Sequence, residues 1–105
     1  MGDCYEANGR YFSKLPYDDK KWKLVHGVAI LQTDGKPFGH CWLEKGDKCH
    51  DFSNGKSIVL PKELYYGLGG MPVKGYKNYK YNRKQFNEKI LKYETWGPWD
   101  SKAPR

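Results

Sequence analysis

The sequence lacks any apolar segment long enough to cross a membrane. No stretch reaches the roughly 18 apolar residues that a spanning helix needs, and the mean hydropathy is −0.93. Residues 1–6 contain neither a signal-peptide pattern nor the Ser or Thr of a myristoylation motif. Cysteine is also scarce. The chain has three, and an odd number of cysteines cannot all pair in disulfides. We therefore expect no membrane partner and a reducing, cytoplasmic setting that leaves a thiol free.

The chain also lacks internal repeats, linkers and low-complexity segments. Its 105 residues suggest one domain spanning 1–105. Nine Tyr, four Trp and four Phe supply large core side chains and offset the polar average.

Acidic residues are nearly absent from 74–92, where Glu88 is the only one. The chain as a whole carries 19 Lys and Arg against 12 Asp and Glu, a net charge of +7. Basic residues interleaved with tyrosines favour a nucleic acid or an acidic protein as partner, but solvated strand and helix faces share this pattern. The cations that would carry such binding are Lys74, Lys77, Lys80, Arg83 and Lys84.

Helical and strand patterns alternate along the chain, which predicts an α+β fold. Helical spacing of apolar residues over 4–15 ends at Pro16, and Asn82 is a typical helix cap before 83–93. A brief helix is expected over 61–66, and strands over 24–31, 38–45, 48–53, 57–60 and 73–81. We therefore expect an N-terminal helix packed on a small antiparallel sheet, a C-terminal helix, and a tail whose tryptophans dock on the body.

Cys4, His40 and Asp51 occur in an order that suits nucleophilic catalysis. A thiol attacks as the thiolate, so it needs a base within hydrogen-bond reach, and the base needs a partner that orients it. Cys4 falls in the first turn of the expected helix, where the helix dipole favours an anion. A Gly46-Asp47 loop would join the strands that carry His40 and Asp51.

The register of that hairpin predicts which side chains meet. With a two-residue loop, Lys45 faces Lys48, and His40 and Asp51 become diagonal neighbours on one face, about 7–8 Å apart by backbone. Asn54 has the wrong parity in this register, but a one-residue slip would make it the partner of His40 instead.

A zinc site is the competing interpretation of the same hairpin. His40-Cys41 and Cys49-His50 look like mirrored ligand pairs. Adjacent strand residues point to opposite faces, however, so at most two of these ligands would meet, and a structural zinc site needs four. We therefore expect no metal and no cofactor.

Residues 38–44 (Phe-Gly-His-Cys-Trp-Leu-Glu) and 51–55 (Asp-Phe-Ser-Asn-Gly), with Cys4 upstream, resemble the transglutaminase-like superfamily of papain-like cysteine enzymes. There a His-x-Trp-x-Glu strand precedes a strand with an Asp-Pro-Ser/Thr turn. The resemblance implies an α+β fold in which a cysteine-bearing helix packs on an antiparallel sheet. It also implies Cys4 as nucleophile, His40 as general base and acid, Asp51 as the residue that orients it, and Trp42 as a wall of the substrate site.

Two departures from that family pattern bear on activity. Phe52 replaces the usual Pro, and no side chain upstream of Cys4 offers an oxyanion donor, which leaves the Cys4 N–H as one donor. The residues therefore predict a cysteine hydrolase or acyltransferase acting on an amide or ester. The alternative is a basic binding module, including an inactive descendant of the enzyme fold. The small, Lys- and Tyr-rich composition is typical of accessory proteins of bacteriophages.

Overall fold

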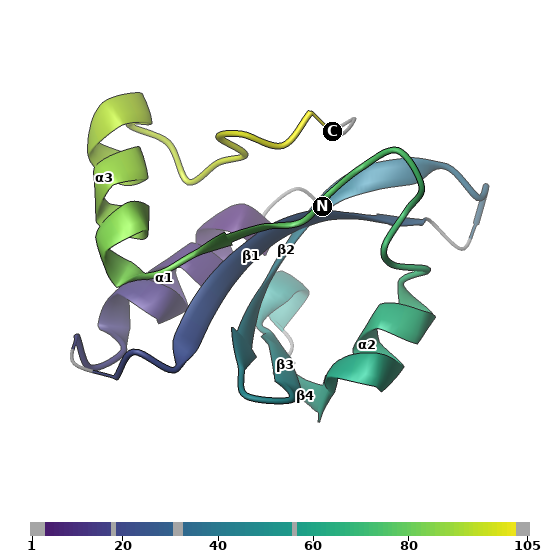
Figure 1. The fold of residues 1–105 in the computed structure, drawn as a ribbon, viewed down its shortest axis with the longest axis horizontal. Coiled ribbons are helices and arrows are strands. Elements are labelled where there is room, and N and C mark those ends of the chain that lie inside the picture. Colours follow the sequence, from purple (N-terminus) through teal and green to yellow (C-terminus); the bar gives the residue numbers. More distant parts are fainter. Residues whose placement is uncertain (1–3, 18, 31–32, 56, 103–105) are drawn as a thin grey trace.

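A computed structural model describes residues 4–17, 19–30, 33–55 and 57–102, with only the backbone of Asn54. The fold class is α+β, as predicted: an N-terminal helix, a five-stranded antiparallel sheet and a C-terminal helix (Figure 1). The elements in chain order are α1 (Cys4–Lys14), β1 (Trp22–Ile30), β2 (Pro37–Lys45), β3 (Lys48–Asp51), the 3₁₀ turn η1 (Ser53–Gly55), β4 (Ile58–Pro61), α2 (Lys62–Leu68), β5 (Tyr79–Tyr81) and α3 (Arg83–Tyr93).

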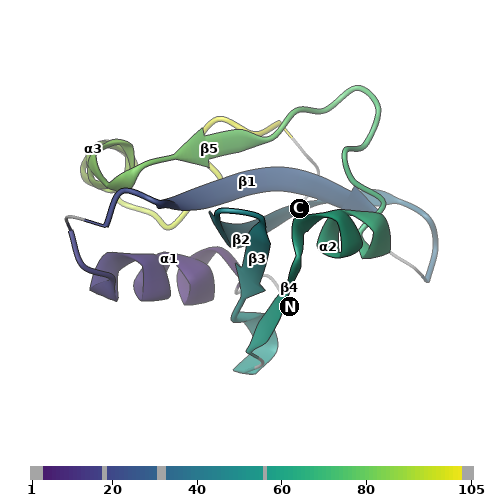
Figure 2. The same cartoon turned by 60° about the horizontal axis from the view of Figure 1, so that its bottom comes forward.

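The sheet has the order β4-β3-β2-β1-β5, so the two longest strands, β1 and β2, lie near its centre. They pair over nine residues, and β5 lies beside β1 at one edge (Figure 2). Lys45 pairs with Lys48, which confirms the predicted two-residue loop. Gly46 in that loop has a φ of 60°, a left-handed conformation that glycine adopts without strain.

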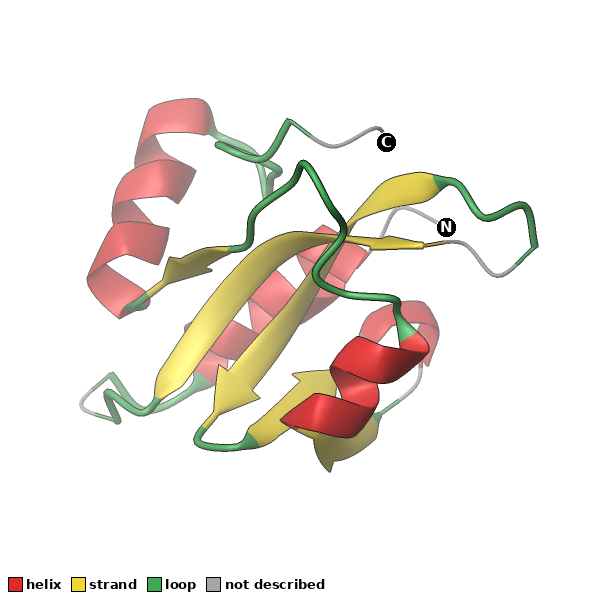
Figure 3. Cartoon of the chain, turned by 45° about the vertical axis from the view of Figure 1, so that its right-hand side comes forward, coloured by secondary structure: helices red, strands yellow, loops and turns green. Residues whose placement is uncertain are grey.

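The helices cover both faces of the sheet. Figure 3 shows α2 in front of the strands and α1 behind them. Side chains alternate along β2, so Cys41 and Leu43 join the core cluster shared with α1 and α3, whereas Trp42 joins the cluster shared with α2. One strand therefore contributes to two cores, and the residues that follow His40 are buried on both faces.

Several element boundaries differ from the predicted ones. The expected strand over 73–81 is present only as β5, because Pro72 and Gly75, whose φ is 90°, interrupt extended structure before Tyr79. The strand expected over 48–53 ends at Asp51, whose side chain accepts a hydrogen bond from the Ser53 N–H and starts the turn. Leu31, the expected end of the first strand, lies outside the described residues.

The C-terminal segment packs on the helical end of the molecule. Asn82 and Gln85 form a capping box at the start of α3, as the Asn82 cap predicted. Trp96 and Trp99 pack against the core that α1 and α3 share, which confirms the expected docking. A Cβ on Gly9 of α1 would lie 2.6 Å from Trp96 Cε3, so glycine is required here for close packing.

Within the described residues, no helix is long and apolar enough to span a membrane.

His26 on β1 lies beneath this C-terminal segment. Its side chain is fully buried, its ring centroid is 4.7 Å from that of Trp99, and neither ring nitrogen has a hydrogen-bond partner within the described residues. Burial lowers the pKa of His26 to about 3, although the charge of Asp100 opposes this effect. The folded state therefore holds a neutral imidazole.

This buried imidazole predicts a specific loss of stability in acid. The pKa of His26 is lower in the folded chain than in the unfolded chain, so its contribution is complete above pH 6.5 and is lost as the pH falls toward 3. His26→Phe removes this proton uptake. We expect the variant to gain stability relative to the wild type as the pH falls, by at most about 1.4 kcal/mol per pH unit. Urea unfolding at pH 7, 5 and 4 measures this, and parallel losses in both proteins would contradict the account.

Candidate functional site

Asn8 joins the cysteine-bearing helix to the strands. It lies one helical turn after Cys4 and is fully buried. Its Nδ2 group donates to the carbonyl oxygens of Cys4 and Cys41, both at 3.0 Å, and lies 3.2 Å from Asp51 Oδ1. Its Oδ1 accepts the Phe52 N–H at 3.0 Å. One side chain therefore fixes the start of α1 against both β2 and the end of β3.

His40 and Asp51 contact each other as the hairpin register predicted. His40 Nε2 lies 3.2 Å from Asp51 Oδ2. The side chains are 16% and 9% exposed, respectively, so solvent screens the pair only weakly. The structure thus brings together two residues that are eleven positions apart, on neighbouring strands of the sheet.

Tyr65 of α2 is a third member of this hydrogen-bond group, and no pattern in the sequence indicated it. Its hydroxyl donates to Asp51 Oδ2 at 2.7 Å and lies 2.9 Å from His40 Nε2. Burial and the adjacent Asp51 carboxylate raise the pKa of Tyr65, so the hydroxyl stays protonated and remains a donor. Tyr65 therefore holds the carboxylate and the imidazole from the α2 side of the sheet.

The Cys4 side chain reaches the same imidazole from α1. It is 7% exposed and lies close enough to the His40 side chain for its hydrogen bonding and charge to raise the pKa of that imidazole. Since Nε2 faces Asp51 and Tyr65, Nδ1 is the ring nitrogen left for the sulfur. The structure therefore brings Cys4, His40 and Asp51 together.

Charges and hydrogen bonds in this group favour an ionised state. Burial lowers the pKa of His40, but hydrogen bonds and charges from Asp51 and Cys4 outweigh it and raise the pKa to about 9. Burial would raise the pKa of Asp51, yet His40, the Ser53 N–H and Tyr65 together hold it well below its usual range. At neutral pH the imidazole is thus a cation beside a carboxylate.

Phe52 has a role that proline could not fill. Its N–H is the donor that Asn8 Oδ1 accepts, and proline has no N–H. Phe52, which stands where the transglutaminase-like pattern has proline, therefore supplies a backbone donor to Asn8, the residue that positions the start of α1.

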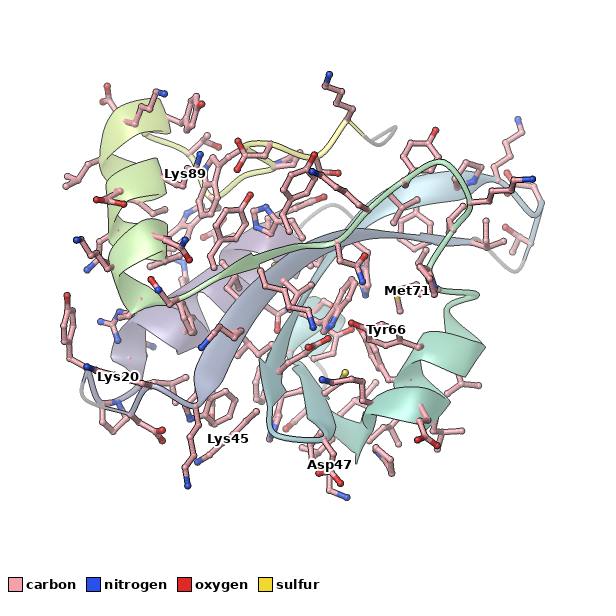
Figure 4. The ribbon with its side chains drawn as sticks, viewed as in Figure 1. Lys20, Lys45, Asp47, Tyr66, Met71 and Lys89 are labelled. Carbon is pink, nitrogen blue, oxygen red and sulfur yellow. The ribbon has the colours of Figure 1, made fainter. Side chains whose placement is uncertain are left out.

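Trp42 and Glu44 support the site from within the core. Trp42 is fully buried, its ring centroid lies 5.7 Å from that of His40, and its Nε1 donates to Glu44 at 2.9 Å. The Glu44 carboxylate also accepts from Tyr66, which points from α2 toward the strands (Figure 4), and pairs with Lys62 and Lys80. The expected role of Trp42 as a substrate-contacting wall does not fit this burial, because the indole exposes no surface to a ligand.

The other two cysteines differ from Cys4 in their surroundings. Cys41 and Cys49 are fully buried and, like Cys4, not in disulfides. Burial raises the pKa of Cys41 well above its ordinary value, and burial and Glu44 raise that of Cys49 to about 12. Both should be inert thiols at neutral pH. Within the described residues, no group of three or more His, Cys, Asp or Glu side chains is placed to hold a metal ion.

The side chain of Asn54, the alternative partner for His40, lies outside the described part of the structure. The Asp51 carboxylate contacts Nε2 of the His40 imidazole, and the hairpin has the predicted register. Asn54 falls within the turn η1 that follows β3.

An open pocket of about 290 Å³ borders the site. His40, Asp51 and Tyr65 supply its polar wall, and the rest is apolar: Ala29, Ile30, Phe38, Ile58, Leu60, Leu68, Gly69 and Met71. Met71 lies just beyond α2 on this side of the sheet (Figure 4). A larger cavity, about 460 Å³, lies elsewhere and is lined by none of the three predicted residues. The smaller pocket is therefore the one that borders the imidazole and the carboxylate, and Cys4 is not among its lining residues.

Comparison with known proteins adds no relative: no family model, curated protein or solved structure matches this chain. The interpretation of the site therefore depends on its geometry and chemistry.

Proposed function

We propose that this chain is a cysteine-dependent hydrolase or acyltransferase that acts on an amide or ester carbonyl through a thioester. The observation that carries the proposal is the contact of His40 with Asp51 at 3.2 Å, together with a Cys4 side chain close enough to raise the pKa of the same imidazole. A thiol, an imidazole and a carboxylate in this sequence of contacts are the groups that nucleophilic catalysis requires.

The proposed chemistry follows from the positions of the protons. The proton of the Cys4 thiol rests on His40, so the two react as a thiolate–imidazolium pair, and the thiolate attacks the carbonyl carbon. His40 then gives that proton to the leaving amine or alcohol as the tetrahedral intermediate collapses to a thioester. Water attacks the thioester in hydrolysis, or an amine attacks it in acyl transfer, and either step regenerates the thiol. Asp51 stabilises the imidazolium and fixes the ring, with Tyr65 and Ser53 as its own donors.

The transglutaminase-like resemblance remains part of this proposal. A cysteine at the start of a helix, a histidine on one strand and an aspartate on the next, in an antiparallel sheet, are the placements that the resemblance implied. We also retain the cytoplasmic setting, since all three cysteines are free thiols. The apolar pocket beside His40 would accept an apolar part of the acyl donor.

The predicted basic binding surface is less favoured than the enzyme. Lys80 pairs with Glu44 at 3.0 Å, and the guanidinium of Arg83 donates to two carbonyl oxygens at the end of α1. The charge of Lys80 is therefore neutralised within the protein itself, whereas Arg83 keeps its charge but is fixed at the end of α1.

Acylation by an activated ester tests the proposal. We expect p-nitrophenyl acetate to transfer one acetyl group to Cys4, detected in the Cys4 peptide by mass spectrometry together with a burst of p-nitrophenol. Cys4→Ala should abolish the burst, and His40→Ala should slow it about 100-fold, the low end for loss of a general base. An acetyl group spread over lysines, with the same burst in Cys4→Ala, would refute the proposal.

A further inference from the structure

A second cavity, larger than the pocket beside His40, has a chemistry unrelated to the thiol. It measures about 460 Å³ and lies where the C-terminal end of α1, the start of β1 and the first turn of α3 meet. Lys20 marks this end of the molecule in Figure 4. Cys4 begins the 11-residue helix α1 and Leu15 follows its end, so the cavity and the thiol are separated by about 16 Å, the length of the helix.

The cavity wall carries an excess of positive charge. Among the described residues that line it, four are cations, Lys20, Lys23, Arg83 and Lys84, and one is a carboxylate, Asp19. That carboxylate is already engaged, since it accepts the Lys21 N–H at 3.2 Å and pairs with Lys45 at 3.3 Å. Within the described part of the chain, no acidic group pairs with the Lys20 or Lys84 ammonium.

Arg83 is held rigidly in this wall. Its two terminal nitrogens donate to the carbonyl oxygens of Leu15 and Ser13, both at 2.8 Å. These hydrogen bonds give partners to carbonyl oxygens at the end of α1, but they do not neutralise the guanidinium charge. The Nε atom is buried and has no hydrogen-bond partner among the described residues. A fixed cation with one donor left is suited to an incoming anion.

Aromatic rings form the remaining wall. Phe12 and Trp22 are buried there, whereas Tyr17 is 62% exposed. The Arg83 guanidinium lies 5.3 Å from the centre of the Tyr17 ring, within cation–π range, so a cation and an aromatic ring lie next to each other at the cavity. Such a surface accepts a flat ring by stacking while the lysines contact charged groups.

We propose that this cavity binds a phosphorylated ligand with an aromatic ring: a nucleotide, either free or as one unit of a single strand. Lys20, Lys84 and Arg83 contact the phosphates, and Tyr17 contacts the base. The volume lies within the range of small-molecule sites, about 300–1,000 Å³. This site differs from the tyrosine- and lysine-rich segment before β5, none of whose residues line the cavity.

Titration of ¹⁵N-labelled full-length protein with ATP, inorganic phosphate and oligothymidylate tests the proposal. We expect ATP or the oligonucleotide to shift the amide signals of residues lining the cavity. The double variant Lys20→Glu/Lys84→Glu should weaken this binding at least about tenfold, as local loss of phosphate contacts predicts. The matched control Lys36→Glu/Lys48→Glu makes the same charge change at exposed lysines outside the cavity, and should change affinity less than about twofold.

Two further arms separate the parts of the proposal. Tyr17→Ala should weaken binding of ATP but not of inorganic phosphate. Tighter binding of ATP than of the oligonucleotide would identify a free nucleotide as the ligand, and the reverse order would identify a single strand. Equal weakening in the control variant would overturn the site, because it would indicate long-range attraction alone. Displacement of ATP by a poly-glutamate peptide at equal concentration would overturn the nucleotide in favour of an acidic protein. Cys4→Ala should leave the binding unchanged, so this proposal stands or falls separately from the enzyme.

Discussion

At pH 6–7 iodoacetamide is expected to alkylate Cys4 faster than Cys41 or Cys49, and His40→Ala is expected to slow that reaction at least about tenfold. Cys4 lies beside a cationic imidazole, whereas the other two thiols are fully buried and have raised pKa values. The thiolate is the reactive form, so removing the imidazole removes the group that stabilises it. Mass spectrometry of the three cysteine peptides over time measures each rate.

A second histidine variant separates this effect from general loosening of the fold. His50→Ala removes a half-buried imidazole from β3 that has no contact with Cys4. We expect it to change the Cys4 rate less than about twofold, while Cys41 and Cys49 stay protected in both variants. Similar rates for all three thiols in the wild type, or the same slowing by His50→Ala, would contradict the proposed pair.

Asn8→Leu is expected to destabilise the fold by about 3 kcal/mol or more, a large loss for a single substitution. The amide of Asn8 is fully buried and bonds to Cys4, Cys41, Asp51 and Phe52. Leucine fills similar space but leaves the Phe52 N–H and part of the Asp51 carboxylate without partners. Urea unfolding measures the change in the free energy of unfolding.

Asn87→Leu on α3 serves as the control, because Asn87 is half-buried and its side chain makes no hydrogen bond within the described residues. We expect it to change stability by no more than about 0.5 kcal/mol. Where Asn8→Leu remains folded in the cold, the faster alkylation of Cys4 should also be lost, since α1 is no longer fixed to β3. A loss of less than about 1 kcal/mol would mean that Asn8 does not connect α1 to the strands as described.

The parts of the site that follow from local rules could be predicted from the sequence. A two-residue turn at Gly46-Asp47 fixes the register, and the register places His40 beside Asp51. The extent of α1 followed from the helical spacing of its apolar residues and from Pro16, which ends the helix. Each of these inferences depends on residues that are neighbours along the chain or across one hairpin.

The parts that depend on long-range packing could not be predicted in this way. Tyr65 reaches Asp51 from a helix whose position over the sheet is set by tertiary contacts, and Asn8 became informative only once α1 was placed against β2. Trp42 alternates to the same face as His40, as parity requires, but α2 covers that face and buries the indole. A period-two pattern identifies a face but does not say whether a helix covers it.

The extent of β5 shows a related limit. Alternating Tyr and Lys over 73–81 is typical of a half-exposed strand, yet only Tyr79–Tyr81 pair, with Leu24, Val25 and His26 of β1. Pairing requires a partner edge as well as a suitable pattern, and the segment before Tyr79 leaves that edge.

Titration of the His40 imidazole by NMR, in the wild type and in Cys4→Ala, tests most directly whether sulfur and imidazole form one coupled pair. We predict an apparent pKa of about 9 in the wild type and a clear decrease in Cys4→Ala, because the hydrogen bonding and negative charge of the Cys4 thiolate contribute to the raised value. A His40 that titrates near 6.5 in both proteins, with no response to Cys4→Ala, would contradict the account.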